Sequence, residues 1–217
     1  MTWMEIAGIL AGSVFLYLGI GVVVLLQRFT CGGTLEQALA AAKVHNAQQL
    51  GVLVNYAYEG GRIGGEAIAD IYTRVLDAME RLGIRGDISV KPSSWGDSGR
   101  VAGAKAYMLE LRLRSRASHA RRMNRWVWVD EERTVDSGWT DPAFQSLGET
   151  GMANGLALRM RAYLKSSRWR LNDRLQGLQK NHVMIGICRG TYQADAELAP
   201  EETEARIEEL MRLCKEK

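Results

Sequence analysis

The feature that most constrains the fold is an alternation of short apolar runs with helical patterns, which repeats five times along the chain. We interpret as strands the segments Gly51–Tyr58, Asp87–Lys91, Arg125–Glu132, Leu156–Leu164 and Val183–Cys188. Helical patterns at about 34–49, 66–81, 101–123, 142–153, 169–179 and 200–215 precede, separate and follow them. Because no hairpin signal joins two strands, the pattern predicts a parallel α/β sheet. Right-handed crossovers leave two arrangements, an open doubly wound sheet or an arc of a (β/α)8 barrel.

Charged and polar residues stand where the predicted strands end. Lys91, Asp130, Tyr163 and Arg189 each follow or close an apolar run. The carboxyl ends of parallel strands meet at one edge of a sheet, and in a barrel they ring one mouth, where active sites are built. The sequence therefore predicts that these four side chains face one mouth.

Five segments, in the same order, resemble the proline dehydrogenase family, a group of FAD-dependent (β/α)8 barrels. They are "GGTLEQALAAAKVHNAQQLGVLVNYAYEG", "ISVKPSSWG", "VWVDEERTVDSGWTD", "LRMRAYLKSS" and "IGICRGTYQADAE". The second is similar to the family pattern I-S-x-K-L-x-x-x-G, the third to V-x-x-D-M-E-D, the fourth to Q-A-Y-L-x-x-[ST], and the fifth to R-L-V-K-G-A-Y-x-E. The resemblance covers roughly residues 28–217.

The resemblance implies FAD, L-proline as substrate, hydride transfer to the flavin and passage of electrons to membrane quinone. It implies that Lys91 stands beside the flavin and the substrate carboxylate, and that Asp130 is the acid that helps to place the substrate. Arg161, Tyr163 and Arg189 match cofactor-binding positions, with Arg189 where the family has Lys. A cationic side chain beside a flavin stabilises negative charge on the reduced ring.

The sequence departs from the family pattern at several of these positions. Pro92 stands where the family has Leu, Arg161 where a flavin-contacting Gln is expected, and Gly186 where an arginine that grips the flavin is expected. The chain ends after the fifth strand–helix unit, before the family's A-T-H-N-type segment and the Arg pair that binds the proline carboxylate. We therefore expect a truncated, partial barrel that binds no cofactor.

The N-terminal run Ile6–Leu26 contains no charged residue. At about 1.5 Å per residue, a helix of this length spans the ~30 Å hydrocarbon core of a bilayer. A signal peptide and a buried soluble helix are the competing interpretations. We predict a transmembrane anchor in residues 1–28, followed by an α/β domain in residues 29–217. Since Arg28 follows the run and no Lys or Arg precedes it, the positive-inside rule predicts a single-pass protein of the inner membrane with its domain in the cytoplasm.

Composition gives little support to two other classes of function. A formal net charge of +3 does not by itself indicate a nucleic-acid partner. The three cysteines and three histidines lack metal-ligand spacing, so we predict no metal site and reduced thiols. The basic stretch "LRLRSRASHARRMNR" predicts a solvated helix face, with contact to anionic lipid as the alternative.

Two functions remain open at this point. The first is a non-catalytic, membrane-anchored accessory or scaffold subunit, with another subunit covering the open edge of the sheet, because exposed strand edges invite pairing. The second is an FAD-dependent proline dehydrogenase that is completed by another chain. The departures at Arg161 and Gly186 favour the accessory subunit, whereas the presence of Lys91 and Asp130 is consistent with the enzyme.

Overall fold

A computed structural model describes residues 31–56, 65–95, 113, 115–131, 146–147, 155–178, 184–190 and 196–215. The chain divides into two units, Met1–Gly51 and Val52–Lys217. The predicted transmembrane run, residues 6–26, lies outside the described residues. Within the described part of the chain, no helix combines the length and the apolar character that a membrane span requires.

In the first unit, helix α2 (Leu35–Ala47) matches the helical pattern predicted at about 34–49 and begins at a capping box formed by Thr34 and Gln37. The Gln37 N–H donates to Thr34 Oγ1 at 3.3 Å, and the Thr34 N–H donates to Gln37 Oε1 at 3.2 Å. Two N–H groups that the first helical turn would leave unpaired are thereby satisfied.

The second unit is built on a parallel sheet of five described strands in the order β1-β2-β3-β4-β5. The strands are β1 (Val52–Asn55), β2 (Gly86–Val90), β3 (Val127–Val129), β4 (Leu156–Arg161) and β5 (Met184–Cys188). The helices described in this unit are α3 (Gly65–Arg81), α4 (Pro92–Trp95), α8 (Ser167–Leu178) and α9 (Pro200–Lys215), with further helical residues at 113, 115–122 and 146–147. All strand pairs are parallel, which confirms the predicted α/β class.

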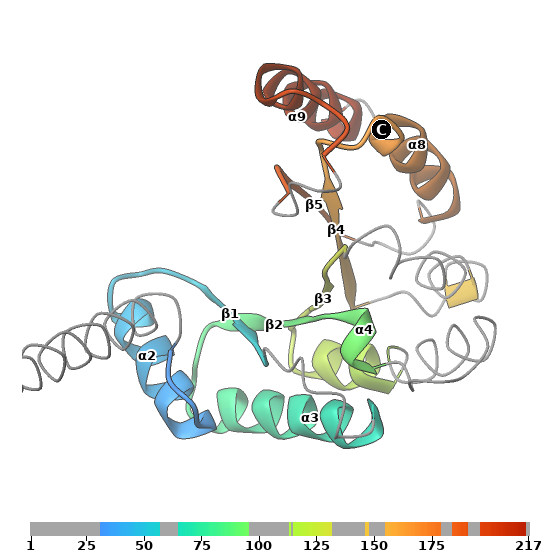
Figure 1. Cartoon of the computed structure of the whole chain (residues 1–217). Helices are drawn as coiled ribbons and strands as arrows, with labels where there is room; N and C mark the ends of the chain where they lie inside the picture. The colour runs from blue at the N-terminus through green and yellow to red at the C-terminus, as the bar shows by residue number, and fades with distance from the viewer. Residues whose placement is uncertain are drawn as a thin grey trace, which may run out of the picture. The chain divides into compact units, whose positions relative to one another are not determined.

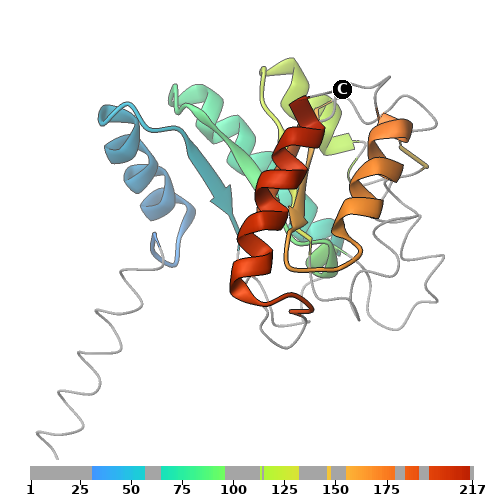
Figure 2. The same ribbon diagram turned by 90° about the horizontal axis from the view of Figure 1, so that it is seen from above.

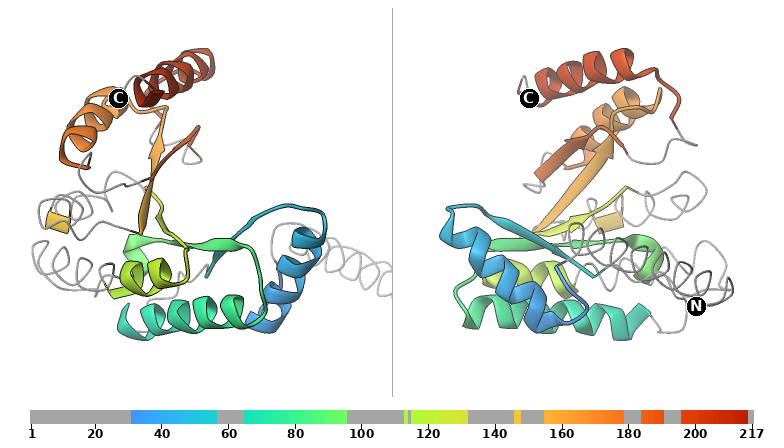
Figure 3. Two further views of the ribbon diagram at one scale, coloured as in Figure 1. Left: turned by 180° about the vertical axis from the view of Figure 1, so that it is seen from behind. Right: turned by 60° about the vertical axis from the view of Figure 1, so that its left-hand side comes forward.

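The sheet curves, and α3, α8 and α9 lie on its outer, convex side (Figure 1, Figure 3). Helices α8 and α9 lie next to each other over β4 and β5 (Figure 2). Sequential strand order with helices on one side is the arrangement of a (β/α)8 arc and not of a doubly wound sheet, which carries helices on both faces. Between the two predicted arrangements, the described residues therefore support the partial barrel.

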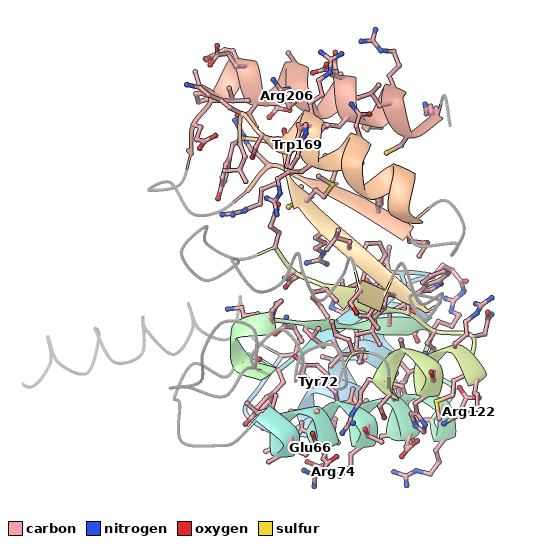
Figure 4. All side chains as sticks on the ribbon, turned by 90° about the vertical axis from the view of Figure 1, so that its right-hand side faces the viewer. Glu66, Tyr72, Arg74, Arg122, Trp169 and Arg206 are labelled. Carbon is pink, nitrogen blue, oxygen red and sulfur yellow. The ribbon has the colours of Figure 1, made fainter. Side chains whose placement is uncertain are left out.

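The core of this unit lies between the sheet and its outer helices. Alternate strand residues such as Ile88, Val127 and Leu158 point outward and are almost completely buried. Helix α3 packs its periodic apolar face against β2, and α8 packs against β4. Each buried apolar side chain contributes about 1.5–3 kcal/mol by leaving water. Tyr72 of α3 points toward the sheet, whereas Arg74 points away from it (Figure 4). The Tyr72 hydroxyl accepts from the Tyr56 N–H at 3.0 Å, and burial raises the pKa of this phenol.

The basic stretch differs from its prediction, because two of its arginines are not on a solvated face. Arg116 is buried and donates to Glu66 at 3.2 Å, to Asp70 at 2.6 Å and to the Ala69 carbonyl at 3.2 Å. Arg125, buried as well, donates to the Gly86 carbonyl at 2.6 Å and pairs with Glu80 at 3.1 Å.

These two arginines, together with His119, which pairs with Asp77 at 2.8 Å, connect the segment 115–125 to the acidic side of α3. Charge composition alone could not distinguish this role from solvation, because the acidic partners lie on a different helix.

The segment after β2 also differs from its prediction. The sequence pattern gives no helix between the strand Asp87–Lys91 and the helical pattern at 101–123, but the chain forms the short helix α4 there. The Ser94 N–H and hydroxyl both donate to the Lys91 carbonyl, at 3.1 and 2.7 Å. Proline at the first helical position, with its φ already suited to a helix, favours this turn.

Candidate functional site

The inner face of the sheet carries a polar cluster centred on Asp130, the residue after β3. Ser89 Oγ donates to Asp130 Oδ1 at 2.9 Å, and Arg159 Nη1 donates to the same oxygen at 3.0 Å. Asn55 Nδ2 reaches the other oxygen at 3.4 Å. Burial raises the pKa of Asp130, and the charges of Arg159 and Lys91, with the Ser89 hydrogen bond, act in the opposite direction. The cluster thus joins side chains that follow or lie on β1, β2, β3 and β4.

The Trp128 side chain lies next to this cluster, in contact with Arg159. Its indole Nε1 donates to Asp87 Oδ2 at 3.0 Å, and the other Asp87 oxygen accepts from the Trp126 N–H at 2.9 Å. The Arg159 guanidinium lies over the Trp128 ring, 5.8 Å from its centroid. The ring lies against Gly186 of β5, where an added Cβ would meet Trp128 Cζ3 at 2.7 Å. A side chain at position 186 and the present position of this ring therefore exclude each other.

A second polar cluster, centred on Glu131, is buried beside the first. Glu131 Oε2 accepts from the Arg161 N–H at 2.6 Å, and Glu131 Oε1 pairs with Arg170 of α8. The Arg161 side chain is 2 % exposed, and its Nη1 donates to the Tyr163 hydroxyl at 3.0 Å. Buried ions require such partners, because isolated charges are costly in the protein interior. Arg161 and Tyr163 thus contact each other within the protein.

Gly190 allows Tyr163 to occupy its position. Gly190 has φ +109°, and an added Cβ would come within 1.7 Å of Tyr163 Cε1. The Tyr163 carbonyl in turn accepts from the Glu197 and Leu198 N–H groups, at 3.2 and 3.0 Å. Tyr163 is therefore packed against Gly190 and is 4% exposed.

The predicted site residues occupy different surroundings. Asp130 is the centre of the first cluster, where burial raises its pKa and the charge of Lys91 partly opposes that rise. Arg161 and Tyr163 belong to the second cluster. Arg189 is separate: it pairs with Glu204 of α9 at 3.4 Å, and both side chains are 58 % exposed.

Sequence reasoning missed Arg159, Trp128, Asp87 and Glu131. A signal for Arg159 was present in "LRMR", because residues 159 and 161 share one face of a strand and a charged residue inside a strand requires a partner. The partner itself could not be identified without the register, which aligns Trp128 with Ala157 and Arg159 with Gly186. Among the described residues, no group of three or more His, Cys, Asp or Glu side chains could hold a metal ion.

Comparison with known proteins places this arrangement among known folds. No family model and no curated protein sequence matches the chain. Solved structures do: Bdellovibrio bacteriovorus proline utilization A (PutA), inactivated by N-propargylglycine, has a TM-score of 0.80 at 16% identity over 94% of this chain. A Bradyrhizobium japonicum PutA variant has a TM-score of 0.65 at 19% identity over 81% of this chain. Corynebacterium freiburgense PutA has a TM-score of 0.65 at 16% identity over 80%.

The chain spans a quarter or less of these proteins: 25%, 21% and 20% of their lengths, respectively. At such identities the likeness concerns the fold alone. The chain therefore has a fold similar to part of PutA, which supports the proline-dehydrogenase-like fold that its motifs predict.

Proposed function

We propose that this protein is a non-catalytic, membrane-anchored accessory or scaffold subunit with a proline-dehydrogenase-like fold. One observation carries the proposal: polar and aromatic side chains on the inner face of the sheet contact one another. Asp130, which the resemblance assigns to the substrate, pairs with Arg159 at 3.0 Å, and the Trp128 ring lies against Gly186. An acid that is already neutralised by an internal cation is a poor partner for a substrate.

The described residues do not fit a flavin. The resemblance requires an arginine at position 186 and a glutamine at position 161. Gly186 offers no side chain, and a side chain there would collide with Trp128, whose indole is held by Asp87. Arg161 is buried against Tyr163 and Glu131. We therefore expect no bound cofactor and derive no flavin chemistry for this chain.

The membrane anchor is supported by sequence. Residues 6–26 carry no charge, and Arg28 follows them. An inner-membrane protein with a cytoplasmic domain is the topology that these features favour. An anchor would hold the domain close to other membrane subunits, which raises their effective concentration.

The edges of the described sheet suggest where a partner would bind. Strands β1 and β5 lie at the two ends of the strand order, and neither contains a charged residue or proline. Natural proteins usually protect such edges with charges, prolines or bulges. We propose that another subunit covers the β5 edge, where Met184 is 37% exposed.

An FAD-dependent proline dehydrogenase that passes electrons to membrane quinone, and is completed by another chain, is the second candidate. It is favoured by the presence of Lys91 and Asp130 directly after β2 and β3, at the positions that the resemblance assigns to the site. In that case Arg161, Tyr163 and Arg189 would lie toward the flavin.

A flavin and activity measurement distinguishes the two candidates. The full chain is purified from membranes in mild detergent, and its flavin absorption and proline-dependent dye reduction are measured. We expect neither stoichiometric flavin nor activity. Flavin near one per chain, with dye reduction that is lost in Asp130→Ala, would overturn the proposal and establish the enzyme.

A further inference from the structure

We propose that Trp128, Asp130 and Ser89 form a recognition site for a small organic cation of the guanidinium or alkylammonium class, and that the native chain fills this site with its own Arg159. The inference goes beyond the proposed function, because it concerns what the inner face recognises whether or not the protein binds a partner.

The geometry around Arg159 is that of a bound cation. Its Nη1 donates to Asp130 Oδ1 at 3.0 Å, and its guanidinium carbon lies 5.8 Å from the Trp128 ring centroid. A carboxylate beside the face of a tryptophan is a general means of binding a cation, because the ring quadrupole and the anion attract it together. Ser89 completes the site by donating to the same carboxylate oxygen at 2.9 Å.

The walls of the site are held by contacts that do not involve Arg159. Asp87 fixes the Trp128 indole at 3.0 Å, and Ser89 and Asn55 both donate to Asp130. Gly186 gives the ring its space. Removal of the Arg159 side chain should therefore leave a preformed site, and preformed groups bind a ligand without the cost of ordering them.

The site is accessible from solvent. The side chains of Arg159 and Asp130 are 35% and 20% exposed. A dissolved cation can therefore reach the carboxylate once the guanidinium is absent. In the native chain, Arg159 excludes cationic ligands from Asp130 and so acts as an internal competitor.

The test uses the full chain in detergent, the variant Arg159→Ala, and methylguanidinium chloride at millimolar concentration. Trp fluorescence and the thermal midpoint are recorded during titration. We expect Arg159→Ala to lower the midpoint by several degrees and methylguanidinium to restore part of the loss saturably. If Arg159→Ala is unfolded by circular dichroism, recovery of the folded signal on addition of methylguanidinium is the readout.

Two controls make the result specific. The Arg121 guanidinium lies over the Trp126 ring at 5.4 Å but donates to the amide oxygen of Asn124, so Arg121→Ala tests the aromatic contact without a carboxylate. Adding Asp130→Asn to Arg159→Ala removes the anion. Saturable binding by Arg159→Ala alone supports the proposal. No saturable response, no recovery of fold, or an equal response in either control overturns it.

Discussion

Gly186→Ala tests the packing that carries the proposed function. The new Cβ would lie 2.7 Å from Trp128 Cζ3, a distance at which one of the two groups must move. The ring cannot move freely, because its Nε1–H is bonded to Asp87 at 3.0 Å and Arg159 lies on its face. Overpacking of this kind costs about 1–3 kcal/mol. Replacing glycine in an unstrained backbone returns about 0.4–1 kcal/mol through the unfolded state, so we expect a net loss of about 1–2 kcal/mol.

The assay for this prediction is urea unfolding followed by Trp fluorescence, with the full chain in detergent. Gly51→Ala is the matched control, since a Cβ there meets nothing within 4 Å, so it should raise the free energy of unfolding by about 0.4–1 kcal/mol. A double-mutant cycle sharpens the result: in a Trp128→Phe background the smaller ring should reduce the cost of Gly186→Ala. If Gly186→Ala is as stable as the native chain, or if the cycle shows no coupling, the contact between Trp128 and Gly186 does not hold the inner face.

Three further predictions concern separate parts of the molecule. Arg116→Ala should lower the free energy of unfolding by about 1–3 kcal/mol, because it removes a 9% exposed side chain that is bound to two acids of α3. Arg74 is exposed, so Arg74→Ala should change the stability little, and equal urea midpoints for the two variants would contradict the prediction. Burial raises the folded-state pKa of Asp130 above its usual 3.8, so the folded state holds a proton more tightly than the unfolded state does. The stability that this group contributes is therefore present below the unfolded-state pKa and is lost as pH rises through the folded-state pKa. In urea titrations at a series of pH values, Asp130→Asn should lack this fall in stability, and parallel pH profiles for the variant and the native chain would argue against it. In sealed vesicles the anchor through residues 6–26 should shield the domain from protease added on the periplasmic side, and digestion from that side would refute the orientation.

Most of the secondary structure was predictable from local patterns. The helical patterns at about 34–49, 66–81, 169–179 and 200–215 match α2, α3, α8 and α9 to within a few residues. Patterns of this kind are informative because burial on one face leaves a period in the sequence. The parallel class followed from the alternation of strands and helices. The motif resemblance added the barrel type, which the likeness to PutA supports at the level of fold.

The candidate site was predictable only in part. Asp130 was predicted because it follows a strand, and the structure places it at the centre of a cluster. Arg189 follows a strand as well, yet it pairs with an exposed glutamate of α9. The end of a strand fixes the position of the backbone but not the direction of the side chain. A charged side chain there can pair with an oppositely charged residue on an outer helix instead of facing the inner side of the sheet.

The sequence by itself determined the order of the elements, the parallel sheet and the absence of a side chain at position 186. Only the tertiary structure decided that Trp128 takes that space and that Arg159 neutralises Asp130. Both contacts depend on the strand register, which aligns Trp128 with Ala157 and Arg159 with Gly186 across neighbouring strands. Register depends on long-range pairing and on packing against the outer helices, and a side-chain period within one segment carries no information about either.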